Sequence, residues 1–174
     1  IKPFIKKSSI EIPENFEENR QIGENESEIC QIIRQDLIED FIIYVNKKTL
    51  PLTMQVHHSV YESNLFLIKN EKISLIEYAA FFGATQIFKY LFMNDVSFGP
   101  TIWLYAVHSD NPEIIHILEE NGIKNPSFVK CYKEAIKCYH NDVANYIKTN
   151  HMSNYNEKKE IKKEVHVYEV LYKK

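Results

Sequence analysis

The sequence predicts an all-α fold built from stacked helical hairpins. An apolar pattern with helical spacing recurs along the chain, and a turn signal interrupts each copy at the same place. The composition, 44% hydrophobic and 26% charged, is that of a soluble globular domain. At 174 residues, the chain is long enough for one domain with its own core or for one short repeat array.

The repeat is clearest between residues 75–96 and 102–123. At a constant shift of 27 in residue number these positions align: Tyr78 with Tyr105, Ala79 with Ala106, Ile87 with Ile114, Leu91 with Leu118, and Val96 with Ile123. A third copy at 132–147 follows at a shift of 29, which places Ala135 on Ala106. Because a sequence period of this size is typical of repeat architectures, we expect each copy to be one structural unit.

The interruption in each copy predicts a tight turn between two short helices. Gly83 can end the first helix in the left-handed conformation. In the next copy Asp110 or Asn111 can adopt that conformation and cap the second helix, with Pro112 in its first position. In the third copy we expect Asn141 to be the cap.

The N-terminal third is less regular. Residues 1–24 are predicted to be an extended segment, and residues 25–46 a degenerate first unit whose Asp36 aligns with Gln86 at a shift of 50. Residues 47–73 are too long for an ordinary repeat loop. We expect this insertion to pack on the array, with a short helix near residues 59–66 as one of two open possibilities.

The remaining chain divides into three clear units, 74–98, 99–125 and 126–150, and a tail, 151–174. Apolar residues recur in the tail at helical intervals, with Lys and Glu on the other face. This pattern favours a charged helix that caps the stack over the alternative, a strand at 165–171.

The repeat resembles the ankyrin repeat, with its pattern Thr-Pro-Leu-His-x-Ala-Ala-x-x-Gly-His-x-Asp-Ile-Val-x-x-Leu-Leu. In the first clear copy the matching residues are Ile76, Ala79, Ala80, Gly83, Ile87, Phe88, Leu91 and Phe92. In the second they are Thr101, Ala106, Glu113, Ile114, Ile115, Leu118 and Gly122. The whole chain is similar to a divergent ankyrin-repeat group that is expanded in some parasitic protists.

Two departures modify what this resemblance implies. The Thr-Pro-Leu-His tetrad is incomplete in both copies, at 74–77 and at 101–104, so the resemblance does not carry over the hydrogen bonds of its Thr and His. The period, 27 and then 29, is also shorter than the family's usual 33. The implied fold is therefore an ankyrin-type solenoid with shortened hairpin fingers, in which Trp103 takes a core leucine position and is buried.

The resemblance implies a non-catalytic module that binds another protein. In the family, the variable positions after the Ala pair face the concave groove, and here these positions are Phe81, Phe82, His108, Ser109 and Lys137, with Cys138 beside the last. Two interpretations stay open. The groove contacts a partner, or one phenylalanine packs against residues 47–73 and the chain is a structural spacer within a longer repeat protein.

The sequence shows no pattern of catalytic or cofactor-binding residues. Cys131, Cys138 and His140 lack the further ligands of a zinc site, and we expect no metal. His57-His58 could pair with Cys30, Glu62 or Asp36 as base and nucleophile, but no surrounding motif supports this. We therefore predict no enzymatic activity and no cofactor.

Charge and cysteine content limit the partners further. The net charge of −3 gives no basic field for nucleic acid, and no apolar run is long enough to span a membrane. Three scattered cysteines favour a reducing, cytoplasmic location. Since the chain begins with Ile1, we expect a piece of a longer protein, monomeric in its own right.

Overall fold

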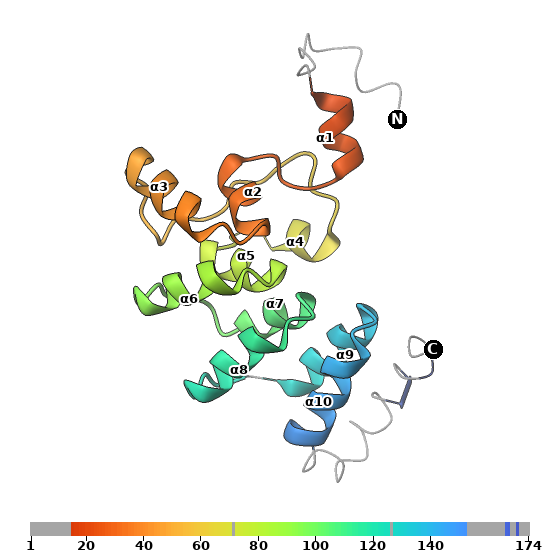
Figure 1. Ribbon diagram of the computed structural model, residues 1–174. Helices are drawn as coiled ribbons and strands as arrows, with labels where there is room; N and C mark the ends of the chain where they lie inside the picture. The colour runs from red at the N-terminus through yellow and green to blue at the C-terminus, as the bar shows by residue number, and fades with distance from the viewer. Residues whose placement is uncertain (1–14, 71, 126, 153–165, 168–169, 171–174) are drawn as a thin grey trace.

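The protein is an all-helical stack of helix pairs in which each pair is joined by a tight turn (Figure 1). The computed structural model describes residues 15–70, 72–125, 127–152, 166–167 and 170. The pairs are α2 (Glu28–Arg34) with α3 (Ile38–Lys48), α5 (Leu75–Phe82) with α6 (Thr85–Met93), α7 (Ile102–His108) with α8 (Pro112–Glu120), and α9 (Phe128–Lys137) with α10 (Asn141–His151). The first helices stack in the order α2, α5, α7, α9. The predicted all-α fold class is confirmed for the described residues.

One backbone position defines the turn of every pair. Asp36, Gly83, Asp110 and Tyr139 all have a positive φ, between 52° and 70°. Each lies between the end of the first helix and the start of the second. Glycine, aspartate and asparagine adopt this left-handed region more easily than other residues, which explains why the turn is visible in the sequence at Gly83 and Asp110.

The capping predictions hold in the second clear unit and fail in the third. Asn111 accepts a hydrogen bond from the backbone N–H of Glu113, and Pro112 begins α8. In the third unit the left-handed residue is Tyr139, so Asn141 is the first residue of α10 and not its cap. His140 takes the cap position and makes no side-chain capping bond.

The turn also corrects the alignment of the first unit. The left-handed residue is Asp36 in the first unit and Gly83 in the next, so the shift between them is 47 rather than 50. Both shifts place apolar residues of α3 on apolar residues of α6, because a slip of three positions is nearly one helical turn. The apolar pattern alone cannot distinguish them.

Hydrogen bonds link the turns of neighbouring pairs. The Asp36 carboxylate accepts from the backbone N–H groups of Gln86 and Ile87, each at 3.0 Å, and so caps α6 from the previous pair. Asn111 Nδ2 donates to the Gly83 carbonyl at 3.1 Å. These bonds fix the register of one pair on the next.

Residues 74–77, which stand in place of the Thr-Pro-Leu-His tetrad, form a capping box at the start of α5. Ser74 accepts from the Glu77 backbone N–H, and Glu77 Oε2 accepts from the Ser74 backbone N–H at 3.0 Å. Glu77 Oε1 also accepts from the backbone N–H of Gly99 at 3.2 Å. Ser74 and Glu77 thus satisfy the helix start with their own side chains.

The core runs through the middle of the stack. Residues Leu75 to Phe81 of α5 are all buried, and the small residues Ala79, Ala106 and Ala135 are fully buried where first helices pack on one another. Trp103 is 3% exposed and donates from Nε1 to the Ile123 carbonyl at 3.0 Å. The predicted burial of Trp103 is confirmed.

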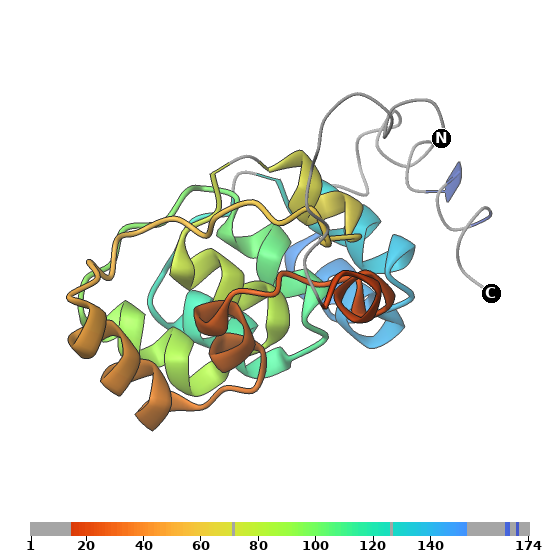
Figure 2. The ribbon, with the colours of Figure 1, turned by 90° about the horizontal axis from the view of Figure 1, so that it is seen from above.

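The segments outside the pairs differ from the sequence predictions. Residues 16–22 form α1 (Phe16–Ile22), which corrects the extended segment predicted there; residues 1–14 lie outside the described residues. The helix of the 47–73 insertion is α4 (Leu65–Lys69), later than the predicted 59–66, because Asn64 is its cap. Figure 2 shows α4 on the opposite side of the stack from α3 and α6.

The loops between units and the C-terminal tail were predicted to form hairpin fingers and a capping helix. The loops 94–101 and 121–127 contain no strand at any described residue. In the predicted capping helix, 151–174, residues 166, 167 and 170 are helical. Residues 153–165, 168–169 and 171–174 lie outside the described residues.

Candidate functional site

The predicted binding residues lie together at the ends of the first helices. Phe81 and Phe82 end α5, His108 and Ser109 end α7, and Lys137 ends α9. The structure therefore brings these positions to one face of the stack. It leaves only part of that face open.

Helix α4 covers part of this face with one aromatic side chain. The ring of Phe66 stacks on Phe81, with centroids 5.8 Å apart and planes 15° apart, and lies 4.2 Å from the His108 ring. Phe66 also meets Tyr105 edge to face at 5.0 Å. As a result Phe81 is 7% exposed, and the His108 side chain is 8% exposed.

These contacts bear on the two interpretations of the inner face. One phenylalanine packs against the insertion, as the alternative interpretation expected, and it is Phe81. The physical reason is that the 47–73 insertion returns to the stack and contributes an aromatic ring of its own to the inner face. Phe82, Ser109 and Lys137 remain partly or largely exposed.

Phe82 contacts its own helix, α5, and Arg34 of α2. Its ring lies 4.7 Å from Tyr78, and the Arg34 guanidinium carbon lies 5.8 Å from the ring centroid. Arg34 in turn donates to Tyr78 Oη at 2.9 Å and pairs with Glu24 at 2.8 Å. This arginine side chain holds the start of the stack together.

A polar cluster lies beneath α4, where α7 meets α9. His108 Nδ1 is 3.3 Å from Cys138 Sγ, and His108 Nε2 is 3.3 Å from Glu134 Oε1. Lys137 Nζ donates to the other carboxylate oxygen, Oε2, at 3.0 Å. The pKa of Glu134 is lowered to about 2, mainly by the His108 imidazole and in addition by Lys137.

The thiol in this cluster is not poised as a nucleophile. Burial raises the pKa of Cys138 to about 11, and the negative charge of Glu134 adds to this effect. Because the thiolate is the reactive form of cysteine, Cys138 is protonated near neutral pH in this environment. The thiol, the imidazole and the carboxylate thus lie in the sequence of a catalytic triad, but the thiol is not activated.

The other sequence candidates are not assembled into a site. Cys131 is buried and accepts from Asn125 Nδ2 at 3.1 Å, and the possible metal ligands near Cys138 in the described chain include neither Cys131 nor His140. His57, His58 and Glu62 line one small hollow of about 70 Å³, so the structure does bring Glu62 to the two histidines. The Cys30 thiol is not activated as a nucleophile, because burial raises its pKa. Asp36 is used as a helix cap.

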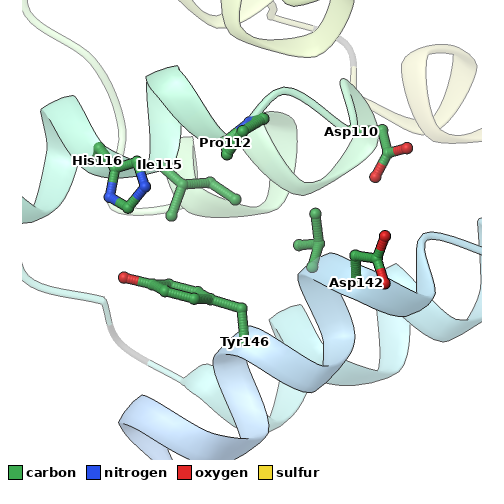
Figure 3. A pocket seen from close by; sticks show the side chains of 7 residues that line it. Asp110, Pro112, Ile115, His116, Asp142 and Tyr146 are labelled. Carbon is green, nitrogen blue, oxygen red and sulfur yellow. The ribbon is translucent and has the colours of Figure 1, made fainter.

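An open groove separates α8 from α10, the second helices of the last two units (Figure 3). Its volume is about 330 Å³, and Ile115 and Val143 form an apolar floor. Asp110 and Asp142 lie at one end, while His116 and Tyr146 face each other at the other end. The groove exists because α8 and α10 diverge while α7 and α9 stay packed.

The far end of the groove is closed by hydrogen bonds. Tyr146 Oη donates to Glu119 Oε2 at 2.7 Å, and His151 Nε2 donates to Glu119 Oε1 at 2.6 Å. Glu119 is thus the tie between α8 and α10, and it keeps the width of the groove fixed at this end.

Neither the groove nor the polar cluster was predicted from the sequence. The helical spacing between Glu134 and Cys138 was visible and places them on one helix face. Their meeting with His108 depends on how α7 and α9 pack, which no local pattern encodes. The groove depends on the same packing.

Comparison of the chain with protein-family models, with curated proteins and with solved structures finds no match. In the part of the chain that the structure describes, no helix has the length and apolar character needed to cross a lipid bilayer. The function is therefore inferred from the residues and their geometry.

Proposed function

We propose that this chain is a non-catalytic protein–protein interaction module built from ankyrin-type repeats. The stacked helix pairs, the shared left-handed turn residue and the hydrogen bonds between turns support this proposal. Buried alanines between the first helices are a further feature that the resemblance implies. The protonated thiol of Cys138 favours a binding role over a catalytic one.

The recognition surface in this proposal is the groove between α8 and α10. The observation that carries it is an apolar floor, Ile115 and Val143, open between two helices and flanked at one end by the carboxylates of Asp110 and Asp142. Apolar hollows rimmed by polar groups are characteristic of interaction sites. The inner face is a weaker choice, because Phe66 already covers Phe81.

The chemistry of the groove selects a short peptide segment as the ligand. An aliphatic or aromatic side chain would bury its apolar surface on Ile115 and Val143, a gain of roughly 1.5–3 kcal/mol. A neighbouring Lys or Arg would lie at the acidic end, near Asp110 and Asp142, where charge complementarity favours it.

The test is selection of random displayed peptides on the folded chain. We expect the selected peptides to carry a basic residue beside an apolar one, and an Asp110→Asn, Asp142→Asn double variant, which keeps a residue suited to the left-handed turn at 110, to lose them. The matched control is Glu39→Gln, Asp40→Asn, which makes the same charge change on exposed positions of α3. If the control loses the peptides equally, their binding depends on net charge and the groove is not the site.

A second candidate function is a structural spacer within a longer repeat protein. The contact of Phe66 with Phe81 favours it, since a filled inner face offers less to a partner. A spacer predicts that no peptide is selected by the native chain. Peptides lost instead in a Phe82→Ser, Lys137→Glu variant would return the binding site to the inner face.

A further inference from the structure

We propose that His108, Glu134 and Cys138 bind a divalent transition-metal ion, with zinc the best match. One possible ligand atom from each residue lies within 4.8 Å of the other two. This is the one such group of three that the described residues contain. The inference does not depend on the proposed peptide groove.

The helices bring the three side chains together in a way that suits a metal. Glu134 and Cys138 are one helical turn apart, at the end of α9, and therefore lie on the same face of that helix. His108 is the last residue of α7, which packs directly on α9. An ion bound here would cross-link the two last units of the stack.

The imidazole of His108 is incompletely bonded for a group so deeply buried. Its side chain is 8% exposed, yet Nε2 has no hydrogen-bond partner within the described part of the chain. Glu134 Oε1 lies 3.3 Å from Nε2 and interacts with the imidazole by charge, without a hydrogen bond. Nδ1 meets the weakly bonding sulfur of Cys138. A buried polar atom without a hydrogen-bond partner is costly, and an ion bound at Nε2 would remove that cost.

The identity of the ligand groups points to zinc. Thiolate, imidazole and carboxylate are its usual protein ligands, whereas calcium and magnesium prefer oxygen alone. Nitrogen and oxygen bound to one tetrahedral zinc lie roughly 3.3 Å apart, given the usual bond lengths. The observed separation of His108 Nε2 and Glu134 Oε1 is 3.3 Å.

Charge and access are also suitable. When zinc binds, it displaces the thiol proton, and one thiolate and one carboxylate then balance its two positive charges. Lys137 holds Glu134 Oε2, which leaves Oε1 for the ion. Glu134 and Cys138 are partly exposed, so that their side chains can adjust and water can fill the fourth position.

The experiment uses the full chain, freed of metal by a chelator and titrated with Co²⁺ as a spectroscopic probe. We expect an ultraviolet thiolate-to-cobalt charge-transfer band together with the visible bands of tetrahedral cobalt, and zinc should bleach both. Zinc at about one hundred times its Kd should also raise Tm by roughly 5–10 °C.

Three variants decide whether the band comes from this cluster. Cys138→Ser should abolish the charge-transfer band, and Glu134→Gln should weaken cobalt binding at least tenfold. A Cys131→Ala, His116→Ala double variant removes a thiol and an imidazole outside the cluster and should leave the band unchanged. Circular dichroism establishes that each variant is folded. A missing charge-transfer band in the native chain overturns the proposal, as does an equal band after Cys138→Ser or full affinity after Glu134→Gln.

Discussion

The Phe66 ring of α4 stacks on the Phe81 ring of α5, with centroids 5.8 Å apart and planes 15° apart. These residues belong to the insertion and to the first clear unit, so the α4 part of the insertion packs against the core. The contact also determines where a partner can bind, because the covered part of the inner face is no longer available. The open apolar hollow lies instead between α8 and α10.

Replacing Phe66 with alanine should therefore destabilise the whole stack. The change removes stacking on Phe81 and His108, and we expect a loss of about 1–3 kcal/mol in the free energy of unfolding. Urea unfolding followed by circular dichroism measures it. Leu65→Ala, on the same helix at a side chain that is 68% exposed, is the control and should cost less than about 0.5 kcal/mol. Equal costs for the two variants would show that α4 does not contribute to the core.

The carboxylate of Asp36 should contribute to stability through a helix in the next unit. Asp36→Gly removes both hydrogen bonds to the start of α6 while keeping the left-handed turn, and we expect a loss of about 1 kcal/mol. Asp36→Asn keeps one of the two acceptors and tolerates the same φ, so its loss of stability should be smaller than that of the glycine variant. Thermal melting of both variants compares them. If the glycine variant is as stable as the native chain, the link between units has no energetic role.

Helix pairs could be predicted from sequence because the turn that joins them has local chemistry. Gly83 and the Asp110-Asn111-Pro112 sequence determine their own backbone conformation. The register of the first unit could not be predicted from apolar spacing, since alignment of Asp36 with Gly83 or with Gln86 preserves nearly the same helical face. Tyr139 in the left-handed position could not be predicted either, because tyrosine gives no turn signal.

The candidate sites were predicted less well for a different reason. Phe81 and His108 were correctly placed on one face, but their burial depends on Phe66, which comes from an earlier segment without repeat pattern. The cluster of His108, Glu134 and Cys138 depends on how two helices pack. Such contacts come from the tertiary structure, and a single sequence does not display them.

Tyr139 offers a test of the shared turn position. Its φ is 62°, a conformation that a bulky residue adopts at a cost of about 1–2 kcal/mol, and its side chain is 60% exposed. Glycine removes that cost, but it also makes the unfolded chain more flexible, and this lowers the free energy of unfolding by about 0.4–1 kcal/mol. We therefore expect Tyr139→Gly to raise the free energy of unfolding by about 0.5–1 kcal/mol, measured by urea titration. Gly83→Ala, the opposite change at the equivalent turn, should lower it.

The tie between α8 and α10 should make stability depend on pH through Glu119. Burial by itself raises the pKa of Glu119, but the hydrogen bonds from Tyr146 and His151 outweigh burial and lower it below 4.5. Because the folded-state pKa is the lower one, the stabilisation is complete above the unfolded-state pKa and is lost as the pH falls through the folded-state value.

Glu119→Gln should remove this pH dependence along with the charge. Near neutral pH we expect the variant to be less stable than the native chain by about 1–2 kcal/mol, since hydrogen bonds to a charged group are lost. The difference should shrink as the pH falls below the unfolded-state pKa and on through the lower folded-state pKa, where the native carboxylate becomes protonated. Urea unfolding of both proteins across this range gives the difference directly, with Glu120→Gln, an exposed neighbour, as the control. A difference that stays constant from neutral to acid pH would mean that the hydrogen bonds of Glu119 do not depend on its charge.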